Sequence, residues 1–189
     1  RFAPRPNHPV YVRTTACFLL IAVLLSVFWR PAFADEPVAK EGDYETRRDQ
    51  LLESYATVAS PGNSYAQLCC LATGRAPNEA AFEASLDMMD NRQDTADFRL
   101  GAILRMLYQF GDSPLLSQAL LDRAKGSVLG FKYSPDDPGI DSLCTWTENH
   151  QILSAGGAYL AGQLYPDEVF TNSGQTGAQL MATHRPRIM

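Results

Sequence analysis

The sequence predicts an all-α protein built from antiparallel helix pairs. Apolar residues recur at i, i+3 and i+4 spacing in successive segments, and short turns rich in Gly, Pro and Asn separate these segments. No segment shows the alternation of apolar and polar residues that is typical of a half-buried strand. Helix pairs of this kind form either a bundle or part of a larger solenoid or α/α toroid. We expect the N-terminal part of a toroid or solenoid.

Six helices follow from the apolar spacing and from the residues that start and stop helices. Asp94 is a candidate cap for the fourth, and the pair Ser113-Pro114 is a start signal for the fifth, because a serine can cap a helix and proline suits its first position. A run of small residues at 155–162 predicts close helix contact in the sixth. The expected helices cover residues 44–58, 65–71, 78–91, 95–110, 114–130 and 146–164, and the residues that share one side of a helix include Leu51, Leu52, Tyr55, Ala81, Phe82, Ser85, Met89, Leu100, Ile103, Leu104 and Leu107.

An apolar run near the N-terminus has the layout of a secretory signal peptide. Basic residues precede the run CFLLIAVLLSVFW at 17–29, and AFA at 32–34 has the small-x-small pattern that signal peptidase reads. We therefore expect a signal peptide at residues 1–34 and an exported protein, periplasmic or extracellular. The alternative is an uncleaved membrane anchor. The uncharged stretch between Arg13 and Arg30 has 16 residues, however, and roughly 20 are needed to cross a bilayer.

The remaining chain divides into two parts. Residues 35–42 are polar and are expected to form a flexible mature N-terminus, and residues 43–189 are expected to form an α-helical domain. The first residue is Arg1 rather than Met, and an amphipathic pattern that begins at Gly177 is still in progress at Met189. We therefore expect an N-terminal fragment of a longer protein.

The charge balance of the expected mature chain restricts its partners. Removing residues 1–34 leaves 155 residues with 12 Lys and Arg against 21 Asp and Glu, a formal net charge of −9. An acidic chain without a basic stripe disfavours nucleic acid and anionic membranes as partners. No membrane span is expected after cleavage. Acidic polysaccharides stay open as partners, because a local basic cleft can form on an acidic protein. The oligomeric state is not predicted.

Three cysteines follow the expected cleavage site: Cys69, Cys70 and Cys144. Either one of the adjacent pair bonds to Cys144 and the other stays free, or all three are buried thiols. No Cys or His spacing of a zinc or haem site is present, and the DDPG turn at 136–139 lacks the spacing of an EF-hand. We expect no cofactor and no metal site. The alternative metal site would use Glu148, His150 and an aspartate of the loop.

Polar side chains are densest in DSLCTWTENH at residues 141–150. Thr145 and Glu148 have the S/T-x-x-E spacing of a capping box, which would place His150 in the first helical turn. The positive end of the helix dipole disfavours the imidazolium form there, and a general base must be a neutral imidazole. The catalytic candidates are His150, Asn149, Glu148 and Tyr159, and the substrate-binding candidates are Trp146 and Asp141.

The same residues also have a purely structural interpretation. In that interpretation Glu148 only caps the helix, and His150 is buried and bonded to a carbonyl group. The aromatic candidates Trp146 and Tyr159 then pack in the core. Both interpretations stay open at the level of the sequence.

The strings CTWTENHQIL, AYLAGQLYPDEVF and NSGQTG resemble a group of large, uncharacterised, exported bacterial proteins that are built from repeated helices and carry a WTENHQIL-type motif. Residues 130–189 would match one stretch of a longer α/α-toroid-like domain. Asn149-His150 is also similar to a pair in α/α-toroid polysaccharide lyases, which abstract a proton next to a uronate carboxylate. Glu148 stands where some of those enzymes have a second Asn, and no tyrosine is matched by motif.

The resemblance implies an exported enzyme that acts on polysaccharide. As a lyase it would use His150 as base, Asn149 as carboxylate partner, and Tyr159 or Tyr165 as acid. As a hydrolase it needs two carboxylates about 5–10 Å apart in one cleft, and the candidates are Glu148 with Asp141 or Asp167. The alternative function is a non-catalytic helical binding or scaffold protein in which His150 is packed away from solvent.

Overall fold

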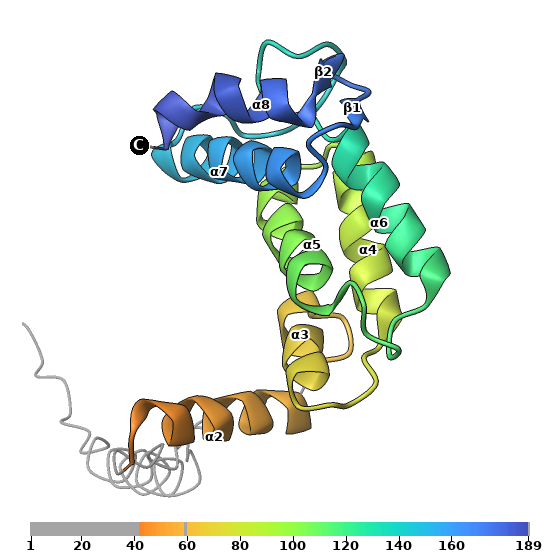
Figure 1. Cartoon of the computed structure of the whole chain (residues 1–189), viewed down its shortest axis with the longest axis vertical. Helices are drawn as coiled ribbons and strands as arrows, with labels where there is room; N and C mark the ends of the chain where they lie inside the picture. The colour runs from red at the N-terminus through yellow and green to blue at the C-terminus, as the bar shows by residue number, and fades with distance from the viewer. Residues whose placement is uncertain (1–41, 59, 189) are drawn as a thin grey trace, which may run out of the picture. The chain divides into compact units, whose positions relative to one another are not determined.

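Helices make up most of the computed structural model, which describes residues 42–58 and 60–188 (Figure 1). The predicted all-α fold is confirmed. The expected signal peptide at residues 1–34 lies outside the described residues, as does nearly all of the segment 35–42. The elements are α2 (Tyr44–Thr57), α3 (Ser64–Ala72), α4 (Glu79–Asp90), α5 (Ala96–Phe110), α6 (Gln118–Gly130), α7 (Glu148–Leu164), β1 (Val169–Phe170), β2 (Gln175–Thr176), α8 (Gly177–His184) and the 3₁₀ turn η1 (Arg185–Arg187).

The core forms where α4, α5 and α6 pack together, each running antiparallel to the helix before it (Figure 1). Their apolar stripes recur every three or four residues, so one face of each helix is buried. The predicted stripes of α4 and α5 are confirmed at every position but Leu107, which is half-buried. Fully buried side chains of this core are Phe82, Leu86 and Met89 of α4, Leu100, Ile103 and Met106 of α5, and Leu120 and Val128 of α6.

A second pair, α7 and α8, runs antiparallel and packs on α5 through α7 (Figure 1). Its helices approach closely because glycine occupies the contact. At the contact with α8, a Cβ added at Gly162 would lie 2.4 Å from the carbonyl oxygen of Gly177. At the contact with α5, a Cβ added at Gly157 would lie 2.6 Å from Leu100 Cδ2. The predicted close contact of this small-residue run is therefore confirmed at these two positions, whereas Gly156 has open space around it. The short antiparallel strands β1 and β2, which the sequence pattern did not indicate, join the pair.

Side-chain caps set most of the helix starts. Asp43, Asn63, Asn78 and Ser117 each accept a hydrogen bond from a backbone N–H in the first turn of α2, α3, α4 and α6. Thr176 and Gln179 form a full capping box at α8. Each cap satisfies one of the backbone donors that a helix start leaves without a partner.

Two of the residues predicted to start helices of this core do not cap them. Ser113-Pro114 begins a turn rather than α6, because Ser117 caps α6 four residues later and its N–H and hydroxyl both donate to Glu79. Asp94 does not cap α5. Its Oδ1 accepts from the N–H of Thr95, and Thr95 occupies the N-cap position with a left-handed φ of 66° and no side-chain cap.

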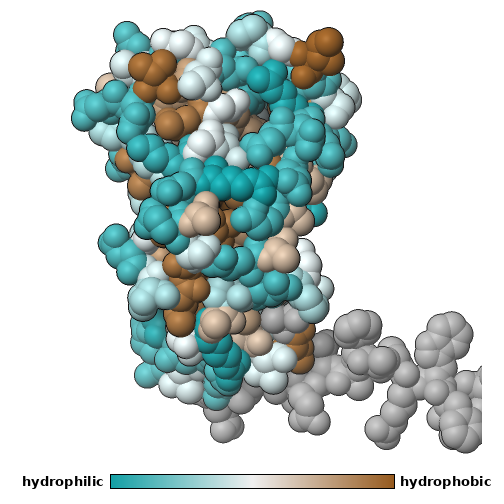
Figure 2. All heavy atoms as spheres, turned by 90° about the vertical axis from the view of Figure 1, so that its right-hand side faces the viewer, coloured by the Kyte–Doolittle hydropathy of each residue, from teal (hydrophilic) through white to brown (hydrophobic). Residues whose placement is uncertain are grey.

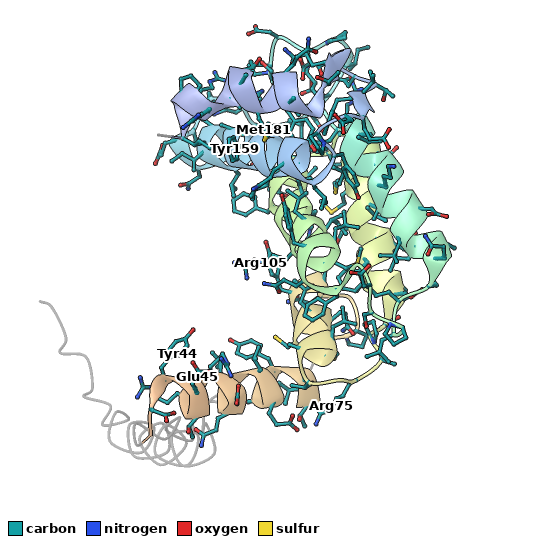
Figure 3. All side chains as sticks on the ribbon, viewed as in Figure 1. Tyr44, Glu45, Arg75, Arg105, Tyr159 and Met181 are labelled. Atoms are coloured by element: carbon teal, nitrogen blue, oxygen red, sulfur yellow. The ribbon has the colours of Figure 1, made fainter. Side chains whose placement is uncertain are left out.

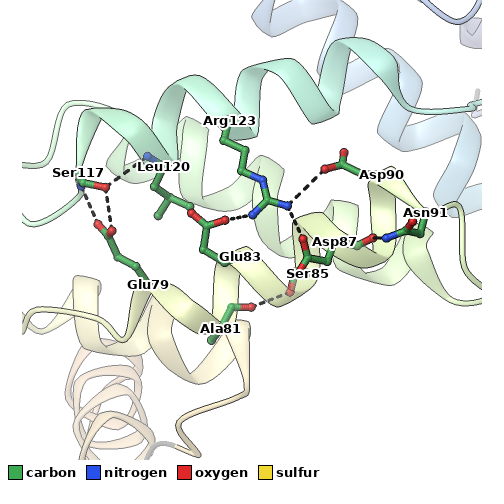
Figure 4. A network of polar contacts seen from close by, with 10 residues as sticks. All are labelled: Glu79, Ala81, Glu83, Ser85, Asp87, Asp90, Asn91, Ser117, Leu120 and Arg123. Atoms are coloured by element: carbon green, nitrogen blue, oxygen red, sulfur yellow. Dashed lines mark hydrogen bonds and ion pairs between the residues drawn. The ribbon is translucent and has the colours of Figure 1, made fainter.

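A charged network joins α4 to α6 on the outer side of the core (Figure 4). The guanidinium of Arg123 on α6 pairs with Glu83, Asp87 and Asp90 of α4. The face of the molecule that includes this side is mostly hydrophilic, with isolated hydrophobic side chains (Figure 2). No helix among the described residues is long and apolar enough to cross a bilayer.

Candidate functional site

The imidazole of His150 and the carboxylate of Asp97 form the closest pairing of titratable groups between α5 and α7. His150 Nδ1 lies 2.6 Å from Asp97 Oδ2, and the two side chains are 13% and 4% exposed. Phe98 packs edge-on against the imidazole, with ring centroids 5.4 Å apart and planes at 86°. The carboxylate and the aromatic edge together fix the plane of the imidazole ring.

The second carboxylate oxygen of Asp97, Oδ1, is buried and has no hydrogen-bond partner in the described part of the chain. Asp97 also lines a groove of about 380 Å³ between α5 and α7, which we call the Asp97 groove. Its other lining residues include Tyr65, Leu104, Tyr108, Ile152 and Leu160. An unpaired buried acceptor costs about 1–3 kcal/mol, and Oδ1 itself is closed to solvent although Asp97 lines the groove.

Two tyrosine hydroxyls of the Asp97 groove already have partners. Tyr65 donates to the carbonyl of Phe98 over 3.1 Å, and Tyr108 donates to the carbonyl of Leu160 over 2.7 Å. Burial raises the pKa of Tyr108, with a smaller contribution from Tyr159, so this phenol stays protonated near neutral pH. These two hydroxyls are therefore donors held in place by backbone carbonyls, and the other polar side chains that line the groove are Asp97, Arg105 and Gln109.

The predicted capping box of Thr145 and Glu148 does not form. α7 begins two residues later than expected, with Thr147 at the N-cap and no side-chain cap, and the carbonyl of Thr145 instead accepts from the side chain of Gln151. His150 is still the third residue of the helix, in its first turn, as predicted. Glu148 and Asn149 are exposed beside it.

Tyr159 and Tyr165 do not join His150. Tyr159 lies nine residues farther along α7, which places it about 13 Å away along the axis and on the opposite side of the helix. Figure 3 labels it on α7, and its phenol is close enough to Tyr108 of α5 to contribute to the raised pKa of Tyr108. Tyr165 caps the far end of α7, and burial raises its pKa, with Glu168 contributing less.

The carboxylate pairs proposed for a hydrolase are not assembled. Glu148 and Asp167 lie at opposite ends of α7, a helix of 17 residues, and are therefore about 25 Å apart. Asp141 is engaged elsewhere, because it pairs with the buried ammonium of Lys132. This ammonium, more than the N–H of Leu143, holds the pKa of Asp141 below its ordinary value. Neither Glu148, Asp141 nor Asp167 lines the Asp97 groove.

Trp146 and the cysteines do not contribute to the Asp97 groove. Trp146 is 78% exposed and lies before α7, so its predicted core-packing alternative is wrong. The three cysteines of the described residues, Cys69, Cys70 and Cys144, are free thiols, so of the two alternatives the bond to Cys144 does not form, and of the three only Cys70 is fully buried. Within residues 42–58 and 60–188, no three His, Cys, Asp or Glu side chains converge to hold a metal, so the alternative built on Glu148 and His150 does not assemble.

Sequence reasoning missed Asp97 and Tyr65. A signal for Asp97 was present, because it precedes Leu100 and Leu104 by three and seven residues and thus lies on the buried stripe of α5. An acidic residue on an apolar stripe needs a partner, and His150 is that partner. Tyr65 carried no comparable signal.

The search for similar proteins found no matching family model, curated protein or solved structure.

Proposed function

We propose that the chain belongs to an exported enzyme that acts on polysaccharide and uses Asp97 and His150 as an acid–base pair. The 2.6 Å contact between the two side chains is the observation that carries the proposal. A carboxylate at Nδ1 fixes the tautomer of an imidazole, which leaves Nε2 as the atom that exchanges a proton.

Proton abstraction, as in a lyase, fits this arrangement better than hydrolysis by two carboxylates. Among the residues that the structure describes, Asp97 is the single carboxylate that lines the groove, whereas glycoside hydrolysis needs two that face each other. In this mechanism His150 is the base, Asn149 binds the substrate carboxylate, and Tyr65 replaces Tyr159 as the proton donor, because its hydroxyl lies on the same groove as Asp97. His150 and Asn149 are not among the lining residues of the groove, and His150 is connected to it through Asp97.

Export is part of the proposal and rests on the apolar run at residues 17–29 with the cleavage pattern at 32–34. A polysaccharide substrate outside the cytoplasm suits such a protein. Export is tested by N-terminal sequencing of the protein secreted by a bacterial host. A mature N-terminus at Asp35 supports the proposal, and retention of residues 1–34 contradicts it.

The enzyme assay follows unsaturated product ends by their ultraviolet absorbance during digestion of a panel of uronic-acid polysaccharides. The wild-type chain is expected to produce them, and His150→Gln and Asp97→Asn are expected to lose at least about 100-fold in rate, the lower range for general acid–base catalysis. Asp112→Asn is the matched control, because Asp112 is exposed and lies outside the Asp97 groove. Full activity of His150→Gln, or no product from the wild type on any uronan, would overturn the lyase proposal.

A non-catalytic helical binding or scaffold protein is the second candidate function. The observation that favours it is the near-complete burial of the pair, since side chains 4% and 13% exposed can serve as a tie between α5 and α7. This candidate predicts that His150→Gln lowers stability and changes no turnover. Measuring the unfolding free energy of the same variants alongside the assay separates the two functions.

A further inference from the structure

A second groove lies between α2, α3 and α5 and is mostly apolar. It has a volume of about 340 Å³, within the range of small-molecule sites, and Leu52, Tyr55, Leu68 and Phe110 contribute to its walls. Leu51 and Tyr55 on its α2 side are 47% and 55% exposed. We call it the Arg105 groove, because the guanidinium of Arg105 is the one cationic lining group among the described residues. Arg105, Gln109 and Tyr65 lie between the two grooves and line the Asp97 groove as well, whereas Ala72, of these two grooves, lines only the Arg105 groove.

Arg105 has no ion pair or hydrogen bond within the described part of the chain, although acidic residues outnumber basic ones. Other arginines are engaged: Arg75 pairs with Glu53, and Arg123 pairs with three carboxylates. Figure 3 shows Arg105 on the side of α5 away from α6. Gln109 lies one turn farther along α5, and its side-chain amide is also without a partner in the described residues. The two side chains therefore share one face of the helix.

This combination is complementary to an anionic group attached to an apolar body. An arginine guanidinium binds a carboxylate through two parallel hydrogen bonds, and the neighbouring amide adds another donor. The rest of the groove offers few free polar groups, because the Asn63 side-chain oxygen already accepts from the backbone of α3 and the Tyr65 hydroxyl is bonded to Phe98. A sugar ring would leave its hydroxyls without partners there.

Charge also decides against two other occupants. The apolar run at residues 17–29 is flanked by Arg13 and Arg30, and no acidic residue occurs in residues 1–34, so it would bring positive charge toward Arg105. A second copy of the chain would present the same arginine to its partner. We propose that the Arg105 groove binds a single-chain anionic amphiphile, with its carboxylate on Arg105 and Gln109 and its hydrocarbon against Leu52, Leu68 and Phe110.

The test is calorimetric titration of the full chain with dodecanoate below its micelle concentration. Wild type is expected to bind it, and Arg105→Gln is expected to bind about tenfold more weakly, which corresponds to the loss of one charge-assisted pair. Arg99→Gln is the matched control, since Arg99 lies on the same helix, has no partner among the described residues and does not line the groove. If dodecanoate also binds the apolar run at residues 17–29, that background is the same in wild type, Arg105→Gln and Arg99→Gln, because none of the substitutions alters the run.

Two further measurements sharpen the test. Ala72 is exposed and lines the groove, so Ala72→Trp fills the groove without disturbing the core and is expected to abolish binding. Dodecanol, which lacks the charge, is expected to bind as weakly to wild type as dodecanoate does to Arg105→Gln. Equal binding of dodecanoate by wild type and Arg105→Gln would overturn the proposal. Binding to vesicles of anionic phospholipid without binding of free dodecanoate would also overturn it, because the ligand would then be a membrane surface. A dimer in light scattering that Ala72→Trp dissociates would overturn it too, because the groove would then be occupied by a second copy of the chain.

Discussion

His150 Nδ1 and Asp97 Oδ2 lie 2.6 Å apart although 53 residues separate them in the chain. The contact joins the first turn of α5 to the first turn of α7. It leaves one carboxylate oxygen of Asp97 buried without a partner. A purely structural tie would be more stable with both oxygens bonded, so the unpaired oxygen is a cost that such a tie does not require.

Removing the carboxylate tests how strongly the pair holds α5 to α7. Asp97→Ala leaves the His150 ring nitrogen without its partner in a nearly buried position, and the unfolding free energy is expected to fall by about 1–3 kcal/mol in urea titrations. Asp112→Ala, which removes an exposed carboxylate, is expected to stay within about 0.5 kcal/mol of wild type. Equal effects of the two substitutions would show that the Asp97–His150 contact contributes little.

The close contact of α7 and α8 predicts opposite effects for two glycines of one helix. An alanine at Gly162 would place its Cβ 2.4 Å from a backbone oxygen of Gly177, so α8 must shift, and a loss of about 1–3 kcal/mol is expected. An alanine at Gly156 meets nothing within 4 Å and gains up to about 1 kcal/mol of helix propensity. Thermal unfolding of both variants checks the pair. A stabilised Gly162→Ala would contradict the packing of α7 on α8.

The helices were predictable because they depend on local spacing, whereas the Asp97–His150 pair depends on a distant contact. The stripe from Leu100 to Leu104 determines the buried face of α5 whatever packs on it. The partner of His150 follows only once α7 is known to lie on α5. The same reason explains why the start of α6 was placed too early, since Glu79 of α4 binds the residue that caps it.

Because His184 is buried, the protein is expected to lose stability at mildly acidic pH. His184 is 2% exposed, and its Nδ1 has no partner among the described residues. Burial lowers the pKa of His184 below the ordinary 6.5, and Arg187 lowers it further by a smaller amount. Asp137 offsets part of this shift. Below about pH 6.5 the unfolded chain therefore binds a proton that the folded chain does not, and the unfolding free energy falls as the pH decreases.

Urea titrations between about pH 5 and pH 8 check this prediction, because the change falls below the ordinary histidine pKa. His184→Met keeps an apolar side chain of similar size and is expected to have a flatter profile than wild type over this range. His150 is present in both proteins, so the difference between the two profiles belongs to His184. Parallel profiles would contradict the assigned role of burial.

The ion pairs of Arg123 are expected to make a salt-dependent contribution to the packing of α6 on α4. Its guanidinium pairs with Glu83, Asp87 and Asp90, which lie at i, i+4 and i+7 on one helix face and repel each other when the cation is removed (Figure 4). The side chains are 35–65% exposed, so each pair contributes little, and Arg123→Met is expected to lose about 1 kcal/mol in total at low salt.

At about 1 M NaCl the Debye length falls to about 3 Å, and the difference in unfolding free energy between Arg123→Met and wild type is expected to shrink by half or more. Arg123→Lys keeps one positive charge without the planar fork and should fall between the two. A deficit of Arg123→Met that is the same at both salt concentrations would assign the effect to lost packing of the arginine stem rather than to charge.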